Sequence, residues 1–174
     1  MTDSERKESG SVRWHDLAGI AASGGFAGGG LLILVSAGYR WIGLDPSVWQ
    51  AGFWVEFLSF AVAIVPLYLL TVVGLFFARR ANLDVPAARW WFTAGLVMWS
   101  LNFAITSLFH LPLNIYLAFE PFTAEQAGLM RTLWLALHVP RVVLAIGTHL
   151  AMVKGVVIAA ALASNGPLTD EAHP

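Results

Sequence analysis

The sequence predicts an all-α integral membrane protein, a bundle of four transmembrane helices with both termini in the cytoplasm. Hydrophobic residues make up 57% of the 174 residues and charged residues only 12%, whereas a soluble domain carries about 25% charged residues. The charges gather near the two chain ends and around residues 79–89. The apolar stretches between them are longer than the roughly 20 residues that a helix needs to cross the hydrocarbon of a bilayer.

The apolar stretches predict spans at residues 17–39, 53–77, 90–111 and 127–163. The chain then has three parts: a polar N-terminal arm over residues 1–16, a transmembrane domain over 17–163, and a polar tail over 164–174.

Helix-start signals precede three of the spans. Asp45-Pro46 and Asp84-Val85-Pro86 each place a capping residue next to a proline, which is favoured in the first turn of a helix. The segment from Thr123 to Gln126 has the form of a capping box. We expect Pro112 to end the third helix.

Basic residues favour one orientation, because cytoplasmic loops carry an excess of Lys and Arg. The first loop offers only Arg40, while the arm and the second loop carry three basic residues each: Arg6, Lys7, Arg13, Arg79, Arg80 and Arg89. We therefore expect loops one and three outside, and a location in the bacterial inner membrane.

Composition also excludes several classes of function. The formal net charge is −1 and there is no basic block, so the expected partner is the lipid bilayer and not nucleic acid. The chain has no cysteine, which excludes disulfides, thiolate ligation of haem and cysteine-bound iron–sulfur clusters.

A few ionisable residues lie within or at the edge of the apolar spans. Each costs about 2.5–3.5 kcal/mol on insertion scales, so such residues usually face a bundle interior or a polar cavity. They are Glu56, His110, His138, Arg141 and His149. The first four fall at similar depth, in the outer leaflet, which predicts a polar site there. His149 is eleven residues after His138, about 16 Å along a helix, and cannot join that site directly.

The residue types at this depth indicate catalysis or binding of a flat, apolar molecule. His138 is a candidate general base, Arg141 can hold a phenolate or enolate, and Glu56 can orient the histidine or pair with Arg141. We assign catalytic roles to His138, Arg141, Glu56 and Asn114. Asn102 and Thr106 lie on one helix face with His110, and with Trp134 they are the candidate substrate-binding residues.

The third and fourth spans resemble a family of small four-span membrane proteins that includes the fungal anthrone oxygenases. The matching features are Arg89, then Thr106 and Pro112-Leu-Asn114, then Trp134-Leu-Ala-Leu-His138-Val-Pro-Arg141. The resemblance implies a four-helix membrane bundle that oxygenates a phenolic carbon to a quinone without a cofactor, with a site that includes Asn114, His138 and Arg141.

Two alternatives come from other classes of function. His110 and His138 are expected at similar depth on different helices, as a bis-histidine haem or a copper site requires. The chain is also short enough to be an accessory subunit that packs within a larger membrane complex or forms a homo-oligomer. The glycine-rich sequence of residues 24–30 fits close helix packing in either case.

Overall fold

The computed structural model describes residues 13–164, and these form four long helical spans. The first span, Trp14–Ile42, consists of α2 (Trp14–Leu32), η1 (Ile33–Ala37) and α3 (Gly38–Ile42). The second is α4 (Pro46–Ala81). The third, Pro86–Phe119, consists of α5 (Pro86–Ile105), η2 (Thr106–His110) and α6 (Leu111–Phe119), and the fourth is α7 (Ala124–Ser164).

All four spans are long and apolar enough to cross a membrane, which confirms that part of the predicted fold class. Each span extends beyond its predicted limits, and the first helix begins at Trp14 and not after residue 16. The rest of the predicted N-terminal arm, and the tail after Ser164, lie outside the described residues.

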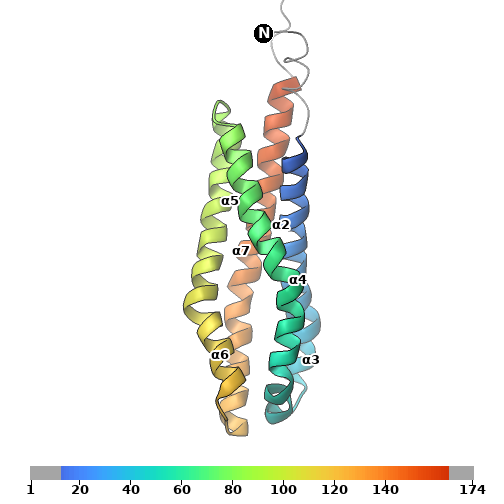
Figure 1. The fold of residues 1–174 in the computed structure, drawn as a ribbon, viewed down its shortest axis with the longest axis vertical. Coiled ribbons are helices and arrows are strands. Elements are labelled where there is room, and N and C mark those ends of the chain that lie inside the picture. Colours follow the sequence, from blue (N-terminus) through green and yellow to red (C-terminus); the bar gives the residue numbers. More distant parts are fainter. Residues whose placement is uncertain (1–12, 165–174) are drawn as a thin grey trace, which may run out of the picture.

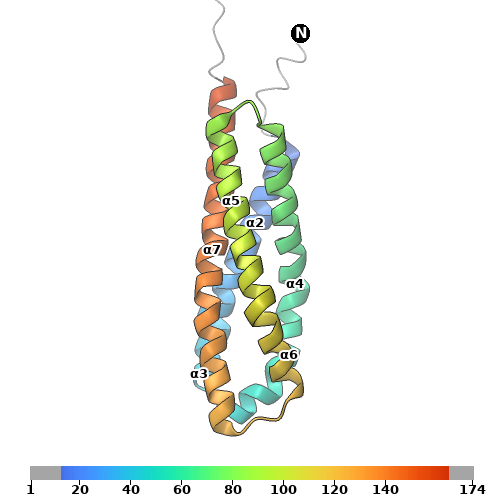
Figure 2. The same cartoon turned by 90° about the vertical axis from the view of Figure 1, so that its left-hand side faces the viewer.

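The spans run antiparallel along one long axis (Figures 1 and 2). Helix α2 lies against α4 and α7, and α5 lies against α7. The start of α2, the end of α7 and the α4–α5 connection are at one end of the bundle, which we call the terminal end. The connections from α3 to α4 and from α6 to α7 are at the other end, which we call the loop end.

Two of the three predicted helix-start signals are confirmed. The Asp45 carboxylate accepts the backbone N–H of Ser47 at 2.9 Å and also its hydroxyl, and these bonds hold the pKa of Asp45 below its usual value. Thr123 and Gln126 bond reciprocally, from the Gln126 N–H to Thr123 Oγ1 and from the Thr123 N–H to Gln126 Oε1. At the start of α5, Val85 and not Asp84 occupies the N-cap position, and no side chain caps the helix.

The prediction that Pro112 ends the third helix is wrong. The chain forms a single π-helical turn over η2 and continues helically to Phe119. The N–H of Leu111 bonds to the Thr106 carbonyl, five residues back. Proline lacks an N–H and is tolerated in the first turn of a helix, and Pro112 is in the first turn of α6, so the π-turn lets the span pass through this proline.

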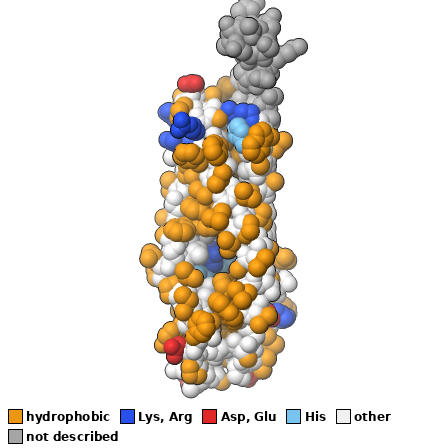
Figure 3. All heavy atoms as spheres, viewed as in Figure 1, with side chains coloured by type: hydrophobic (Ala, Val, Ile, Leu, Met, Phe, Trp, Pro, Cys, Tyr) orange, Lys and Arg blue, Asp and Glu red, His pale blue; other side chains and the backbone are white. Residues whose placement is uncertain are grey.

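The buried hydrophobic side chains form three packed clusters: one near each end of the bundle, and a smaller one of Phe26, Ala27 and Ala145. Near the loop end, Trp41, Trp49, Phe53 and Trp134 are each at most 3% exposed. Trp41 and Trp49 are therefore core residues. Near the terminal end, Leu75, Phe92 and Met152 are fully buried. Hydrophobic side chains cover most of the face seen in Figure 3, as contact with lipid requires.

Several glycines of the first span lie against neighbouring helices. Gly24 faces the His149 ring, Gly25 faces Leu67 and Gly29 faces Ile64. The closest backbone approach is at Gly19, because a Cβ on Gly74 would lie 2.7 Å from the Gly19 Cα. Helices α2 and α4 can meet at this distance only because both positions lack a side chain.

We expect Gly74→Ala to destabilise the protein by about 1–3 kcal/mol, because the new methyl group must push two backbones apart. The matched control is Gly28→Ala, where a Cβ meets nothing within 4 Å; it should be neutral or stabilise by roughly 0.5–1 kcal/mol. Thermal unfolding of both variants in detergent measures the difference. Equal melting temperatures would contradict the close approach.

Candidate functional site

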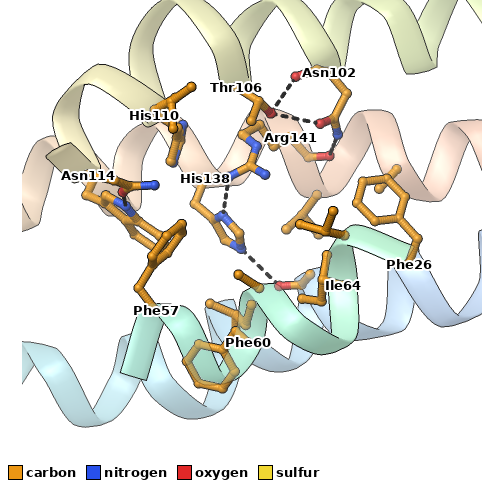
Figure 4. A pocket seen from close by; sticks show the side chains of 18 of the residues that line it. Phe26, Phe57, Phe60, Ile64, Asn102, Thr106, His110, Asn114, His138 and Arg141 are labelled. Carbon is orange, nitrogen blue, oxygen red and sulfur yellow. Dashed lines mark hydrogen bonds between the residues drawn. The ribbon is translucent and has the colours of Figure 1, made fainter. Parts of the chain in front are cut away.

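A cavity of about 210 Å³ lies inside the bundle and is lined by all four spans. Most of its wall is apolar and comes from α2, η1, α3, α4 and α7, with Phe26, Ile33, Trp41, Phe57, Phe60, Ala61, Ile64, Val65, Val142 and Ala145 among the lining residues. The polar part of the wall comes from the third and fourth spans. Its residues are Asn102, Thr106, His110, Asn114, Trp134, His138 and Arg141. Figure 4 shows most of these side chains converging on one space.

His138 is held by hydrogen bonds at both ring nitrogens. Nε2 lies 3.1 Å from the Gly30 carbonyl oxygen of α2, and Nδ1 lies 3.4 Å from Arg141 Nη1 (Figure 4). A carbonyl only accepts and a guanidinium only donates. These contacts therefore assign the neutral tautomer with hydrogen on Nε2 and the lone pair on Nδ1. The ring links α7 to α2 and orients Arg141.

Arg141 brings a positive charge to the cavity without a negative partner. It lines the cavity and is half-buried, and its Nε is buried with no hydrogen-bond partner. Within residues 13–164 no carboxylate lies in ion-pair distance of its guanidinium. Buried charges are normally paired because desolvation costs several kcal/mol. The cavity therefore offers a binding position for an anionic or strongly electron-rich oxygen.

Glu56 does not meet Arg141, although the sequence places the two at similar depth. Its Oε2 pairs with Arg40 Nη2 at 2.6 Å and accepts the indole N–H of Trp41 at 2.6 Å. Arg40 and Glu56 belong to consecutive spans joined by a short connection near the loop end. Glu56 does not line the cavity. Its contacts hold α3 against α4.

His110 lies beside His138 with both ring nitrogens unpartnered. The imidazole is 1% exposed, and neither Nδ1 nor Nε2 has a hydrogen-bond partner among residues 13–164. Its ring packs edge-on against the Trp134 indole at 5.1 Å and against the His138 ring at 6.0 Å between centroids. It is the last residue of the π-turn η2, and π-turns are frequent at functional sites. His110 is thus the imidazole in this cavity with a free lone pair.

Three further polar residues are fixed by bonds across or along the helices. Asn102 donates from Nδ2 to the Arg141 carbonyl at 2.7 Å, and Thr106 donates to the Asn102 carbonyl at 2.8 Å. Asn114 Oδ1 accepts the Trp134 indole N–H at 2.7 Å. The amide nitrogen of Asn114 points into the cavity in Figure 4, so it can donate to a ligand.

His149 is apart from the cavity, as its spacing from His138 predicts. Its Nδ1 lies 3.0 Å from Ser23 Oγ, and Ser23 in turn donates to the Ile20 carbonyl at 3.1 Å. This contact joins α7 to α2 and gives His149 a structural role.

The structure brings together all but one of the residues expected at the site: Asn102, Thr106, His110, Asn114, Trp134, His138 and Arg141 line one cavity, and Glu56 does not. Sequence reasoning missed Gly30, whose carbonyl fixes His138. It also missed Trp41 and Phe60 as lining residues. The only available signal for Gly30 was its small size within a glycine-rich run.

The donor set gives little support to the metal and haem alternatives. Among residues 13–164 no group of three or more His, Cys, Asp or Glu side chains could hold a metal ion. A bis-histidine site would need His110 and His138, yet both nitrogens of His138 are in hydrogen bonds. That leaves one free imidazole, which does not fit a six-coordinate haem iron or a stable copper site.

No family model, curated protein or solved structure matches this chain. The assignment of function therefore depends on the geometry of the cavity.

We expect His110→Phe to leave the free energy of unfolding unchanged or to raise it. Phenylalanine keeps the contact with Trp134 and removes two unsatisfied polar atoms, a change that is neutral or stabilising. The matched variant His138→Phe should lower it by about 1–3 kcal/mol, because the Gly30 carbonyl and Arg141 both lose a partner.

Thermal unfolding of the two variants without ligand tests this contrast. Equal destabilisation would show that His110 has a structural partner and is not reserved for a ligand.

Proposed function

We propose that the protein is a membrane-embedded oxygenase that binds a flat, apolar molecule with a phenolic or enolisable oxygen in the cavity. The observation that carries this proposal is the Arg141 guanidinium, which faces an apolar cavity without a carboxylate partner and beside the unpartnered His110 ring. The resemblance of the third and fourth spans to the anthrone oxygenases points to the same substrate type.

The polar groups have complementary roles in such a site. The substrate ring lies between aromatic walls such as Phe57 and Trp134. Its oxygen accepts from the Arg141 guanidinium and from the amide nitrogen of Asn114, in the manner of an oxyanion site. His138 acts as a positioning residue because its Nδ1 holds the guanidinium.

His110 is the group that we assign to proton transfer, in place of His138. A neutral imidazole with a free lone pair can remove a proton from a carbon that is conjugated with the substrate carbonyl. Arg141 then stabilises the enolate. His138 is less suited to this step because its lone pair already accepts from Arg141.

The enolate passes its electrons to dioxygen, which is the required co-substrate. For a methylene carbon that is conjugated through aromatic rings with a ketone, as in an anthrone, one dioxygen is reduced, the methylene becomes a carbonyl, and one water is released. The carbon loses four electrons and two protons, and the two protons leave with the reduced oxygen atom as water. The protein's own contribution is to bind, orient and deprotonate the substrate in a water-poor cavity.

The distribution of charge supports a defined orientation in the membrane. The basic residues Arg79, Arg80 and Arg89 lie at the α4–α5 connection, on the same end as the start of α2 and the end of α7. We place this terminal end in the cytoplasm of a bacterium, by the excess of basic residues there. The cavity then lies toward the outer leaflet.

Oxygen uptake by the purified full chain with an anthrone tests the reaction. We expect one dioxygen consumed per substrate, and His110→Phe should lower kcat by about a hundredfold or more. Arg141→Met should weaken substrate binding by ~10–100-fold, since one charge-assisted hydrogen bond is worth about 1.5–3 kcal/mol. His149→Gln is the control and should retain activity. Absence of substrate-dependent uptake, or equal activity of the His110 and His149 variants, would overturn the proposal.

Single cysteines test the orientation, since the chain has none of its own. Gly43→Cys, in the loop-end connection, should react with a membrane-impermeant maleimide in intact spheroplasts. Leu83→Cys, in the α4–α5 connection, should react only after the membrane is opened. The reverse labelling pattern would place the termini outside.

A further inference from the structure

The size of the cavity limits what it can enclose. Cavities of about 150 Å³ in apolar protein cores bind one benzene molecule. A cavity of about 210 Å³ therefore encloses one substituted ring, and the rest of a larger molecule, whether the further rings of an anthrone or a hydrocarbon tail, must extend beyond it.

The packing closes the cavity toward both aqueous ends of the bundle. On the loop side, Trp41, Trp49 and Phe53 are each at most 2% exposed and pack with ring centroids 5.2–6.1 Å apart. Arg131 covers this layer by donating to the Trp41 and Leu44 carbonyls at 2.6 and 2.7 Å. On the terminal side, the fully buried core of α4, α5 and α7 fills the bundle. Neither end offers a path from water.

The cavity opens instead at its side, toward lipid. Val65 on α4 and Leu111 on α6 both line the cavity, and each is also 50% exposed on the outer surface. They lie on the two helices that border the space between the second and third spans (Figure 1). The view of this side in Figure 3 shows a small basic patch at mid-height, surrounded by hydrophobic side chains. We call the opening between Val65 and Leu111 the lateral mouth.

We propose, on the basis of the function proposed above, that the ligand is a bilayer-dissolved amphiphile with one oxygen-substituted ring and a hydrocarbon tail. The ring enters through the lateral mouth and places its oxygen against Arg141. The tail remains between α4 and α6 and continues into the lipid. Polar groups deep in the cavity and an apolar rim open to the bilayer are the arrangement that such a molecule requires.

Two matched probes test this inference: 4-methyl- and 4-decyl-2-nitrophenol, whose coloured phenolates report contact with a cation. Both are titrated against the full chain in lipid nanodiscs, with affinity expressed per mole fraction in the bilayer. The decyl tail is in lipid before and after binding, so we expect both probes to bind with similar affinity. Arg141→Met should weaken both by at least tenfold.

Variants at the rim separate a lateral mouth from a closed cavity. Val65→Phe narrows the mouth and should weaken binding of the decyl probe at least tenfold more than binding of the methyl probe. Val62→Phe, on the lipid face of the same helix and 77% exposed, is the control and should match the unmodified protein. Leu111→Trp repeats the test from the opposite rim, with Leu108→Trp as its control.

The outcomes distinguish this inference from the proposed function. Exclusion of the decyl probe while the methyl probe binds through Arg141 would overturn the lateral mouth and leave the proposed site intact. Equal effects of Val65→Phe and Val62→Phe on binding of the decyl probe would also overturn the lateral mouth and leave the proposed site intact. Failure of both probes to bind the unmodified protein would overturn both proposals.

Discussion

The guanidinium of Arg141, placed in an apolar cavity where no carboxylate of the described part of the chain reaches it, is the constraint on which the rest of the site depends. Its charge cannot be removed at accessible pH, so its surroundings must hold it in place. His138 accepts from it, and the Gly30 carbonyl fixes the His138 ring in the tautomer that makes this possible. Asn102 fixes the backbone of the same residue through its carbonyl. His138 is thus the hydrogen-bond partner of the guanidinium, and the place of an ionic partner is free for a ligand.

The spans could be predicted because their signal is local. A run of apolar residues of sufficient length requires a helix in lipid whatever its neighbours are. The capping signals at Asp45 and Thr123 are local in the same sense. Depth along a span also follows from counting residues, and so the sequence correctly grouped His110, His138 and Arg141.

Rotation about the helix axis does not follow from depth. Glu56 is at a suitable depth but faces Arg40 and Trp41, because a short connection brings the end of the first span beside it. The role of Gly30 was also beyond prediction, since a backbone carbonyl becomes a partner only when another helix packs against it. The same is true of His110. Within the described residues, its ring nitrogens lack hydrogen-bond partners because the neighbouring polar groups bond to other residues.

At the π-turn between Thr106 and His110, the number of residues in the chain helps to decide which way the cavity side chains point. Such an effect is usually attributed to the identity of the side chains. An α-helix advances about 100° per residue, and the π-turn absorbs one residue beyond the α-helical count. A relative lacking one residue here could keep every span, and every side chain of the cavity, and form an uninterrupted α-helix. Asn114 would then keep its direction relative to Asn102, because the residue removed is the one that the π-turn absorbs. A chain of unchanged length that formed an α-helix here would instead turn Asn114 by about 100°. In evolutionary terms, a one-residue deletion can straighten this span and leave the site intact, whereas loss of the π-turn without a deletion would turn Asn114 away from Asn102.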